Sequence, residues 1–190
     1  MKLKKIESII KKSKSVAIVE ADGAYWIGNE RGMYPTYFGF MDLDTLMTMF
    51  DLDTEKRESI TEVSSELIAR ADTADYCTAE VPLRRDGTRI IYKGCSLMPL
   101  YYGDKVLYID PRYLDPVADA KEGIECYLRI GSDRRPYVAI KSGMLLVGLI
   151  EPEEVVDELF LNTLKGLYDK SSAVFKATPS ENTYRQEVIG

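Results

Sequence analysis

The feature that most constrains the fold is a pattern of elements that occurs twice in the chain. Each copy starts with a short amphipathic segment of helical periodicity and continues as three short β-rich stretches separated by turn signatures. The first copy predicts a helix at 3–12 and strands at 15–20, 24–28 and 33–37, and the second a helix at 111–120 and strands at 124–130, 136–140 and 144–150. Because closely spaced strands pair antiparallel, the pattern predicts an α+β fold built on two meanders.

The remaining segments complete the domain organisation. Asp42–Phe50 has an N-cap residue, Asp42 or Asp44, and the apolar spacing of a helix. Asp86–Gly87 predicts a hairpin turn, and Gly103–Asp104 separates two more strands. Periodicity does not decide the structure of residues 54–80. We therefore expect a domain at 1–152, with halves at about 1–40 and 105–152 and a variable middle at 41–104, then a helix at 153–170 and a flexible tail at 171–190.

The chain contains no histidine, which limits the chemistry that it can perform. Histidine is the commonest general base, the usual partner of serine and cysteine nucleophiles, and the commonest metal ligand. The three cysteines form no CxxC pair, and neither a GxGxxG nor a GxxxxGK[ST] phosphate loop is present. We therefore expect a non-enzymatic protein with no catalytic residue, no cofactor and no metal site. An enzyme that uses carboxylates is the alternative.

Charge and hydropathy indicate where the protein acts. The formal net charge is -6, from 31 acidic and 25 basic residues, so the chain as a whole is not attracted to nucleic acid or to an anionic membrane. No apolar run has the length of a signal-peptide core or of a membrane-spanning helix. We therefore expect a cytoplasmic protein with reduced cysteines and no membrane partner.

Residues 105–152 have a distinctive order of elements. The strand Val106–Ile109 leads into a helix that begins Pro111-Arg112-Tyr113-Leu114-Asp115, and three strands separated by polar turns then end at Pro152. This order resembles half of a domain of the bacterial DNA sliding clamp, the polymerase III beta subunit. The whole chain also resembles uncharacterised phage and prophage proteins of Gram-positive bacteria, notably in the stretch from Tyr25-Trp26-Ile27-Gly28 to Tyr34-Pro35.

The resemblance implies a DNA-clamp-like domain of two helix-plus-antiparallel-meander halves related by pseudo-twofold symmetry, with extra helices. In such a clamp, helices offer lysine and arginine to phosphates and bind DNA without reading its sequence. The chain has room for one such domain, so a ring would need several copies. The implied partners are double-stranded DNA, further copies of the chain in a homo-oligomer, or a phage replication protein.

Basic residues near the first helix and in turns are the candidates for contacting DNA. The N-terminal segment carries six lysines against one acidic residue, Glu7. The candidate DNA-binding residues are Lys4, Lys5, Lys11, Lys12, Lys14, Arg84, Arg85, Arg134 and Arg135. Solvated helix faces and hairpin tips are the alternative interpretation. Acidic residues outnumber Arg112 and Lys121 around the second helix, which argues against DNA contact there.

Aromatic residues are the candidates for binding a partner. Trp26, Tyr34, Tyr101 and Tyr102 could stack on bases or anchor an interface, and packing on a sheet surface is the alternative. The leading hypothesis is a clamp-like binding or assembly protein that contacts DNA without sequence specificity in phage replication. The alternative is a protein–protein interaction module of a prophage with no nucleic-acid role, which predicts an exposed apolar patch on the helix at 153–169.

Overall fold

The computed structural model describes residues 2–36, 39, 41–52, 54–154 and 158–177. The chain divides into two compact units, Met1–Glu153 and Glu154–Gly190, which are described separately below. The first unit contains both copies of the repeated pattern and the segment between them. The division lies beside the domain boundary that was predicted at residue 152.

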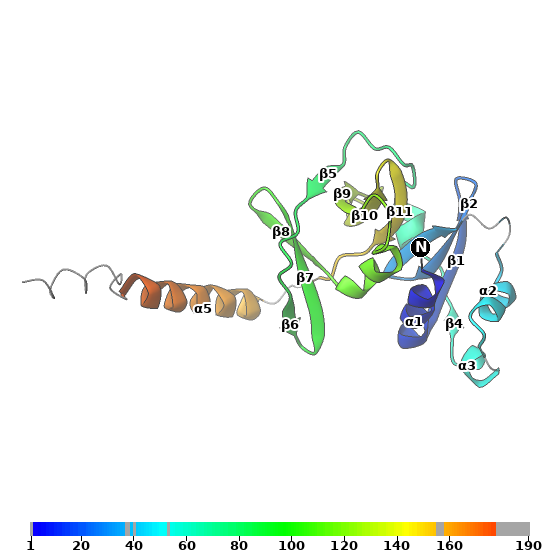
Figure 1. The fold of residues 1–190 in the computed structure, drawn as a ribbon, viewed down its shortest axis with the longest axis horizontal. Helices are drawn as coiled ribbons and strands as arrows, with labels where there is room; N and C mark the ends of the chain where they lie inside the picture. Colours follow the sequence, from blue (N-terminus) through cyan, green and yellow to red (C-terminus); the bar gives the residue numbers. More distant parts are fainter. Residues whose placement is uncertain (1, 37–38, 40, 53, 155–157, 178–190) are drawn as a thin grey trace, which may run out of the picture. The chain divides into compact units, whose positions relative to one another are not determined.

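An eight-stranded mixed sheet is the framework of the first unit (Figure 1). The strand order is β4-β1-β2-β3-β11-β10-β9-β5. The bounds are β1 (Ser15–Ala21), β2 (Ala24–Asn29), β3 (Gly32–Thr36), β4 (Thr61–Glu62), β5 (Val81–Leu83), β9 (Glu125–Ile130), β10 (Pro136–Ser142) and β11 (Leu145–Ile150). Both predicted meanders are present, and they join where Met33 of β3 pairs antiparallel with Leu149 of β11. The predicted α+β class is therefore confirmed.

Side chains alternate along the central strands, so the two faces of the sheet carry separate cores. We call them the first core and the second core. The first core contains, from the sheet, Val16, Ile27, Tyr34, Val138, Ile140 and Ile150. The second core contains Ala17, Trp26, Met33, Tyr137, Ala139 and Leu149. Strands that are buried on both faces need nearly continuous apolar runs, and these strands have them.

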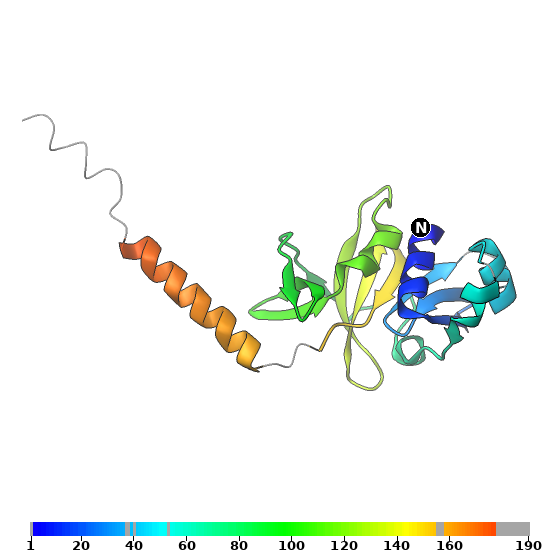
Figure 2. The ribbon, with the colours of Figure 1, turned by 90° about the horizontal axis from the view of Figure 1, so that it is seen from below.

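Two helices lie beside each other on the first core, as Figure 2 shows. They are α1 (Leu3–Ser13), which buries Ile6, Ile9 and Ile10, and η1 (Pro111–Val117). η1 is a 3-10 helix whose Pro116 has no N–H with which an α-helix could continue. The helix predicted at 111–120 is therefore shorter and more tightly wound than expected.

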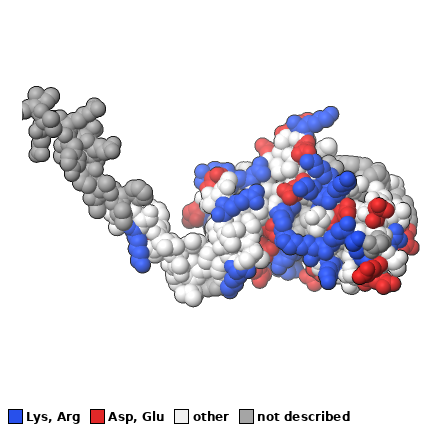
Figure 3. Space-filling model, turned by 60° about the horizontal axis from the view of Figure 1, so that its bottom comes forward, with Lys and Arg blue, Asp and Glu red and all other residues white. Residues whose placement is uncertain are grey.

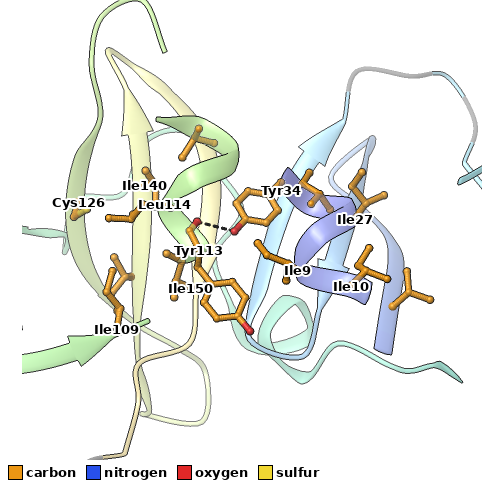
Figure 4. Close-up of a cluster of buried hydrophobic side chains, with 14 of the residues drawn as sticks. Ile9, Ile10, Ile27, Tyr34, Ile109, Tyr113, Leu114, Cys126, Ile140 and Ile150 are labelled. Carbon is orange, nitrogen blue, oxygen red and sulfur yellow. Dashed lines mark hydrogen bonds between the residues drawn. The ribbon is translucent and has the colours of Figure 1, made fainter. Parts of the chain in front are cut away.

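Tyr34 connects η1 to the first meander. Its side chain is fully buried, and its hydroxyl donates a hydrogen bond to the carbonyl oxygen of Tyr113 at 2.6 Å (Figure 4). The hydroxyl of Tyr113 in turn accepts a hydrogen bond from the side-chain amide of Asn29 at 3.2 Å. Burial raises the pKa of Tyr34 well above its ordinary value, so this hydroxyl stays protonated and acts as a donor.

The middle segment passes around the β1 edge of the large sheet. Its elements are α2 (Leu43–Met49), α3 (Thr54–Glu58), β4 and α4 (Glu66–Arg70). Leu46 of α2 packs in the first core, β4 pairs parallel with the start of β1, and Leu67 of α4 packs in the second core. The predicted helix at 42–50 is confirmed as α2, and Asp42 caps it by accepting a hydrogen bond from the N–H of Thr45. Residues 54–80, whose structure the periodicity did not predict, therefore cross from one face of the large sheet to the other.

Residues 71–80 are held on the second face by buried charges. The side chain of Arg129 is 1% exposed and donates to the carboxylate of Glu80 at 2.6 and 2.9 Å. Lys141 donates to the other oxygen of the same carboxylate at 2.9 Å. Burial by itself would raise the pKa of Glu80, but hydrogen bonds from Lys141 and Arg129 outweigh burial and lower it. The network fixes a loop to β9 and β10.

A second, three-stranded sheet consists of β6 (Ile90–Tyr92), β7 (Cys95–Tyr102) and β8 (Lys105–Ile109). The turn predicted at Gly103–Asp104 joins β7 to β8 as expected. The hairpin predicted around Asp86–Gly87 is wrong, because β5 pairs with β9 in the large sheet and β6 pairs with β7. Asp86 does accept a hydrogen bond from the N–H of Thr88, so the local turn forms, but the strands on either side pair elsewhere.

The second unit contains α5 (Glu158–Ala177). The helix predicted at 153–170 is wrong at its start, because Glu153 forms a β-bridge with Tyr108 and the described helix begins at Glu158. It extends further toward the C-terminus than predicted, and residues 171–177, predicted as part of a flexible tail, are helical. No Gly or Pro interrupts the sequence between Gly166 and Pro179, which explains the extension. The rest of the predicted tail, 178–190, lies outside the described residues. Among the described residues, no helix is long and apolar enough to cross a membrane.

Candidate nucleic-acid interface

The lysine-rich helix α1 is anchored by its apolar stripe. Ile6, Ile9 and Ile10 recur at helical spacing and are buried against β2, β1 and η1. The helix ends at Lys14, which adopts the left-handed conformation with φ 56° and whose N–H donates to the carbonyl oxygen of Ile10 at 2.8 Å. Burial of one stripe leaves the opposite side of α1 at the surface.

That opposite side is basic, and we call it the lysine face: Lys4, Lys5, Ser8, Lys11 and Lys12. With about 3.6 residues per turn, these five positions fall within an arc of about 120°. All five are exposed. Figure 3 shows Lys and Arg side chains gathered on a face of the molecule, with acidic side chains interspersed. Four of the lysines predicted to contact DNA therefore lie on one side of α1, and their role in binding stays a prediction.

Acidic neighbours neutralise part of this basic segment. Lys2 forms an ion pair with Asp119, Lys11 forms one with Glu7, and the ammonium of Lys5 lies 3.8 Å from the carboxylate of Asp115. By contrast, Lys4, Lys12 and Lys14 form no ion pair with any of the described residues. The acids of the second repeat, expected to repel DNA, therefore pair with lysines of α1, and three lysines stay available.

A hollow lies between α1 and η1 beside the lysine face. Its volume is about 260 Å³, and its lining residues are Lys5, Ser8, Ile9, Lys12, Arg112 and Asp115. Arg112 is half-exposed, and its guanidinium is held by the carboxylate of Asp110, which accepts from Nε at 2.8 and 3.0 Å and also from Nη2. Sequence reasoning missed Ser8 and Arg112, and the i, i+4 spacing of Ser8 and Lys12 is the signal that could have included the serine.

The other predicted DNA-binding residues lie elsewhere. Arg84 stacks over Tyr101 at 5.4 Å, and Arg85 donates to the carbonyl oxygen of Ile124 at 3.0 Å. Arg135 contacts Asp133 and Glu66, and Glu66 belongs to α4 on the second core, which is the face opposite α1. Arg134 lies in the same β9–β10 turn. The structure therefore does not unite Arg135 with the lysines of α1.

The predicted partner-binding aromatics divide into two pairs. Trp26 and Tyr34 are 3% and 0% exposed, so their side chains belong to the second and first cores and are not available to a partner. They are buried because both faces of β2 and β3 are covered. Tyr101 and Tyr102 are half-buried on β7, with Arg84 and Lys105 over their respective rings. This second pair is the one that a ligand could reach.

A groove elsewhere on the first unit has a balanced lining and indicates no particular ligand. Its volume is about 650 Å³, and its charged residues are Glu30, Arg31, Glu66, Arg70, Arg135 and Glu151. Arg70 is buried and pairs there with Glu151, so this cation already has a counter-ion within the groove. Within the part of the chain that the structure describes, no group of three or more Cys, Asp or Glu side chains could hold a metal ion.

Comparisons with protein-family models, with curated proteins and with solved structures find no match for this chain. Function is therefore inferred from the geometry of the lysine face and its surroundings. The resemblance to a sliding-clamp domain and the phage or prophage origin stay predictions.

Proposed function

We propose that this protein is a non-enzymatic, clamp-like binding or assembly protein that contacts double-stranded DNA without sequence specificity. The contact is the lysine face of α1. The observation that supports it is the presence of Lys4 and Lys12 on one exposed arc, where neither forms an ion pair with the described residues. Lysine offers a flexible point charge to phosphates, which suits binding that does not depend on base sequence.

The distribution of charge supports this proposal in a chain whose net charge is -6. Residues 2–14 contain six lysines and one acidic residue, whereas residues 41–80 contain eleven acidic residues and three basic ones. Such an asymmetry orients a protein in the field of a polyanion, because the acidic segment is repelled while the basic helix is attracted. Binding through α1 is therefore compatible with an acidic protein.

The arrangement of the first unit supports the clamp-like part of the proposal. α1 followed by β1-β2-β3 and η1 followed by β9-β10-β11 are two helix-plus-meander halves. The halves meet where β3 pairs with β11, and α1 contacts η1 on one face. This is the placement that pseudo-twofold halves would have, with paired helices facing the nucleic acid. Action in phage replication and assembly into a homo-oligomer are the corresponding expectations for the biological role.

The proposal is tested by fluorescence anisotropy with a labelled DNA duplex at low and moderate salt, with light scattering to measure the mass with and without DNA. The test variant is K4Q/K12Q. The matched control is K165Q/K170Q, which removes the same charge from exposed positions of α5. We expect duplex binding that weakens with salt, a loss of affinity of tenfold or more in the test variant, and no change in the control.

Two results would contradict the proposal. One is a wild-type protein that does not bind duplex DNA even at low salt. The other is an equal loss of affinity in both variants, because that would indicate attraction by total charge and no specific face. Unequal affinities for duplexes of different sequence would contradict the absence of sequence specificity.

A protein–protein interaction module without a nucleic-acid role is the second candidate. α5 supports it, because Leu159, Leu167 and Tyr168 are 75%, 59% and 71% exposed. Large exposed apolar side chains on one helix are typical of an interaction surface. Two results together would favour this function over DNA binding. The protein would not bind DNA, and its mass in light scattering would change when Leu159 and Leu167 are replaced by glutamine.

A further inference from the structure

We propose that the hollow between α1 and η1 is a seat for a single phosphate group, with Arg112 as its central ligand. The inference rests on the proposed function, because the hollow borders the same lysine face. It adds a defined phosphate site to a face that would otherwise attract DNA through its overall charge alone. The observation that carries it is the convergence of Lys5, Lys12 and Arg112 on a hollow of about 260 Å³.

Arg112 is preorganised to bind an anion. The carboxylate of Asp110 caps η1 by accepting from the backbone N–H of Arg112 at 3.0 Å, and the same carboxylate holds Nε and Nη2 of the Arg112 side chain. The Nη1 group forms no hydrogen bond with the described residues, so its donors are unused. A guanidinium that is already fixed loses little side-chain entropy when a phosphate oxygen binds.

α1 contributes the other side of the hollow. Lys5, Ser8 and Lys12 follow one another at intervals of three and four residues and therefore lie along one line of the helix surface. Lys12 supplies a charge that no described acid neutralises, and the hydroxyl of Ser8 can donate to an oxygen. Two helices thus provide ammonium, hydroxyl and guanidinium donors, which is a set that suits the several acceptor oxygens of phosphate.

The charges of the empty hollow do not cancel. Its lining has three cations and one carboxylate, that of Asp115, which lies 3.8 Å from the ammonium of Lys5. The carboxylate of Asp110 pairs with Arg112, so Lys12 is the cation whose charge no described acid balances. An anion that enters the hollow balances this remaining positive charge. The volume also suits the group, because a water molecule occupies about 30 Å³ in the liquid and the hollow therefore holds a phosphate with some of its water.

The phosphate could belong to a DNA backbone or to a small phosphorylated molecule, and the chemistry of recognition is the same for both. The first probe is inorganic phosphate, titrated into nitrogen-15-labelled protein at constant ionic strength with chloride as the control anion. We expect saturable shifts at the Arg112 Nε and at the amides of Ser8 and Lys12, with no such response to chloride. The shifts are expected to weaken tenfold or more in R112Q.

The second probe is the labelled duplex, measured with R112Q and with R89Q as the matched control. Arg89 is exposed and lies in the segment that connects the two sheets, so R89Q removes an equal charge away from the hollow. We expect a loss of duplex affinity of about fivefold or more in R112Q and none in R89Q. In R112Q the backbone N–H at position 112 can still be capped by Asp110, so the fold is expected to persist, and circular dichroism checks it.

The outcomes separate the two proposals. If the duplex binds through Lys4 and Lys12 but R112Q binds phosphate and duplex like the wild type, the phosphate seat is wrong and the proposed function stands. If phosphate occupies the hollow while the duplex does not bind, the seat stands as a site for a small phosphorylated molecule and the proposed function is wrong. Shifts of equal size with phosphate and chloride would overturn the seat.

Discussion

The hydroxyl of Tyr34 on β3 donates a hydrogen bond to the carbonyl oxygen of Tyr113 in η1 at 2.6 Å, across 79 residues of sequence. The bond joins the meander of the first repeat to the helix of the second inside one core. It also fixes the position of η1, which contains Arg112 and is capped by Asp110. The placement of the hollow beside α1 therefore depends on a buried tyrosine far from it in sequence.

Tyr34→Phe removes this hydrogen bond without changing the volume of the ring. The expected result is a loss of about 1 kcal/mol in the free energy of unfolding, the usual net contribution of one such bond. Urea denaturation measures it, and Tyr76→Phe is the control because Tyr76 is 68% exposed. Equal stabilities of the two variants would show that the Tyr34 hydroxyl contributes nothing.

Glu80→Gln leaves Arg129 and Lys141 buried without their shared carboxylate. We expect a loss of about 3 kcal/mol in the free energy of unfolding, as for other broken buried ion pairs. Glu58→Gln, at an exposed position of α3, is the control.

The same network predicts a dependence of stability on pH. The pKa of Glu80 is lower in the folded protein than in the unfolded chain. Its contribution is therefore complete above the ordinary glutamate pKa and is lost as the pH falls through the lower, folded value. Unfolding free energies measured by urea denaturation from neutral to acidic pH are expected to fall less steeply in Glu80→Gln than in the wild type. Parallel curves would contradict this assignment.

Gly28→Ala places a Cβ atom where the β2–β3 hairpin has no room. That atom would lie 1.9 Å from the carbonyl oxygen of Gly32, which is backbone and cannot rotate away. We expect thermal unfolding of the first unit at a lower temperature, with a cost of about 1–3 kcal/mol. Gly166→Ala in α5 meets no atom within 4 Å and is expected to leave this transition unchanged. A Gly28→Ala protein as stable as the wild type would show that the hairpin is more open than described.

The three cysteines are expected to react in a fixed order. Cys95 is exposed, Cys77 is half-buried and Cys126 is buried, and burial raises the pKa of the Cys126 thiol while Arg85 opposes the effect. Since the thiolate is the reactive form, iodoacetamide at mildly alkaline pH is expected to label Cys95 first and Cys126 only after unfolding. Mass spectrometry of digested samples measures the order, and early labelling of Cys126 in native protein would contradict the described core.

If the protein binds DNA as proposed, the salt dependence of its affinity counts the phosphate contacts that α1 makes. The slope of log affinity against log salt changes by about 0.9 for each phosphate charge that a protein neutralises on duplex DNA. The K4Q/K12Q variant is therefore expected to have a slope smaller by about two than that of the wild type. An unchanged slope with reduced affinity would indicate that these lysines act by stabilising α1.

Local sequence patterns determined the elements that have strong local signals. The apolar spacing of α1, the turns of both meanders and the helix α2 all depend on residues close together in the chain, and each of these predictions is confirmed. Of the two aspartates predicted as the N-cap of α2, Asp42 is the one that caps it. Where the signal was ambiguous, tertiary pairing decided. The segments on either side of Asp86–Gly87 have strand character, yet they pair with β9 and β7 because those partners offer open edges beside them. A local sequence pattern does not indicate which sheet edge is available for pairing.

The candidate site shows the same division. The sequence by itself determined that α1 would carry lysines on one face, because helical periodicity converts spacing directly into direction. Only the tertiary structure decided which charges meet: it placed Asp115 and Asp119 beside Lys5 and Lys2, put Arg112 across a hollow from Lys12, and buried Trp26 and Tyr34. Electrostatic interactions and burial depend on distances in space. Residues that are far apart in the chain come close to one another only when the chain folds and both faces of the sheet are covered.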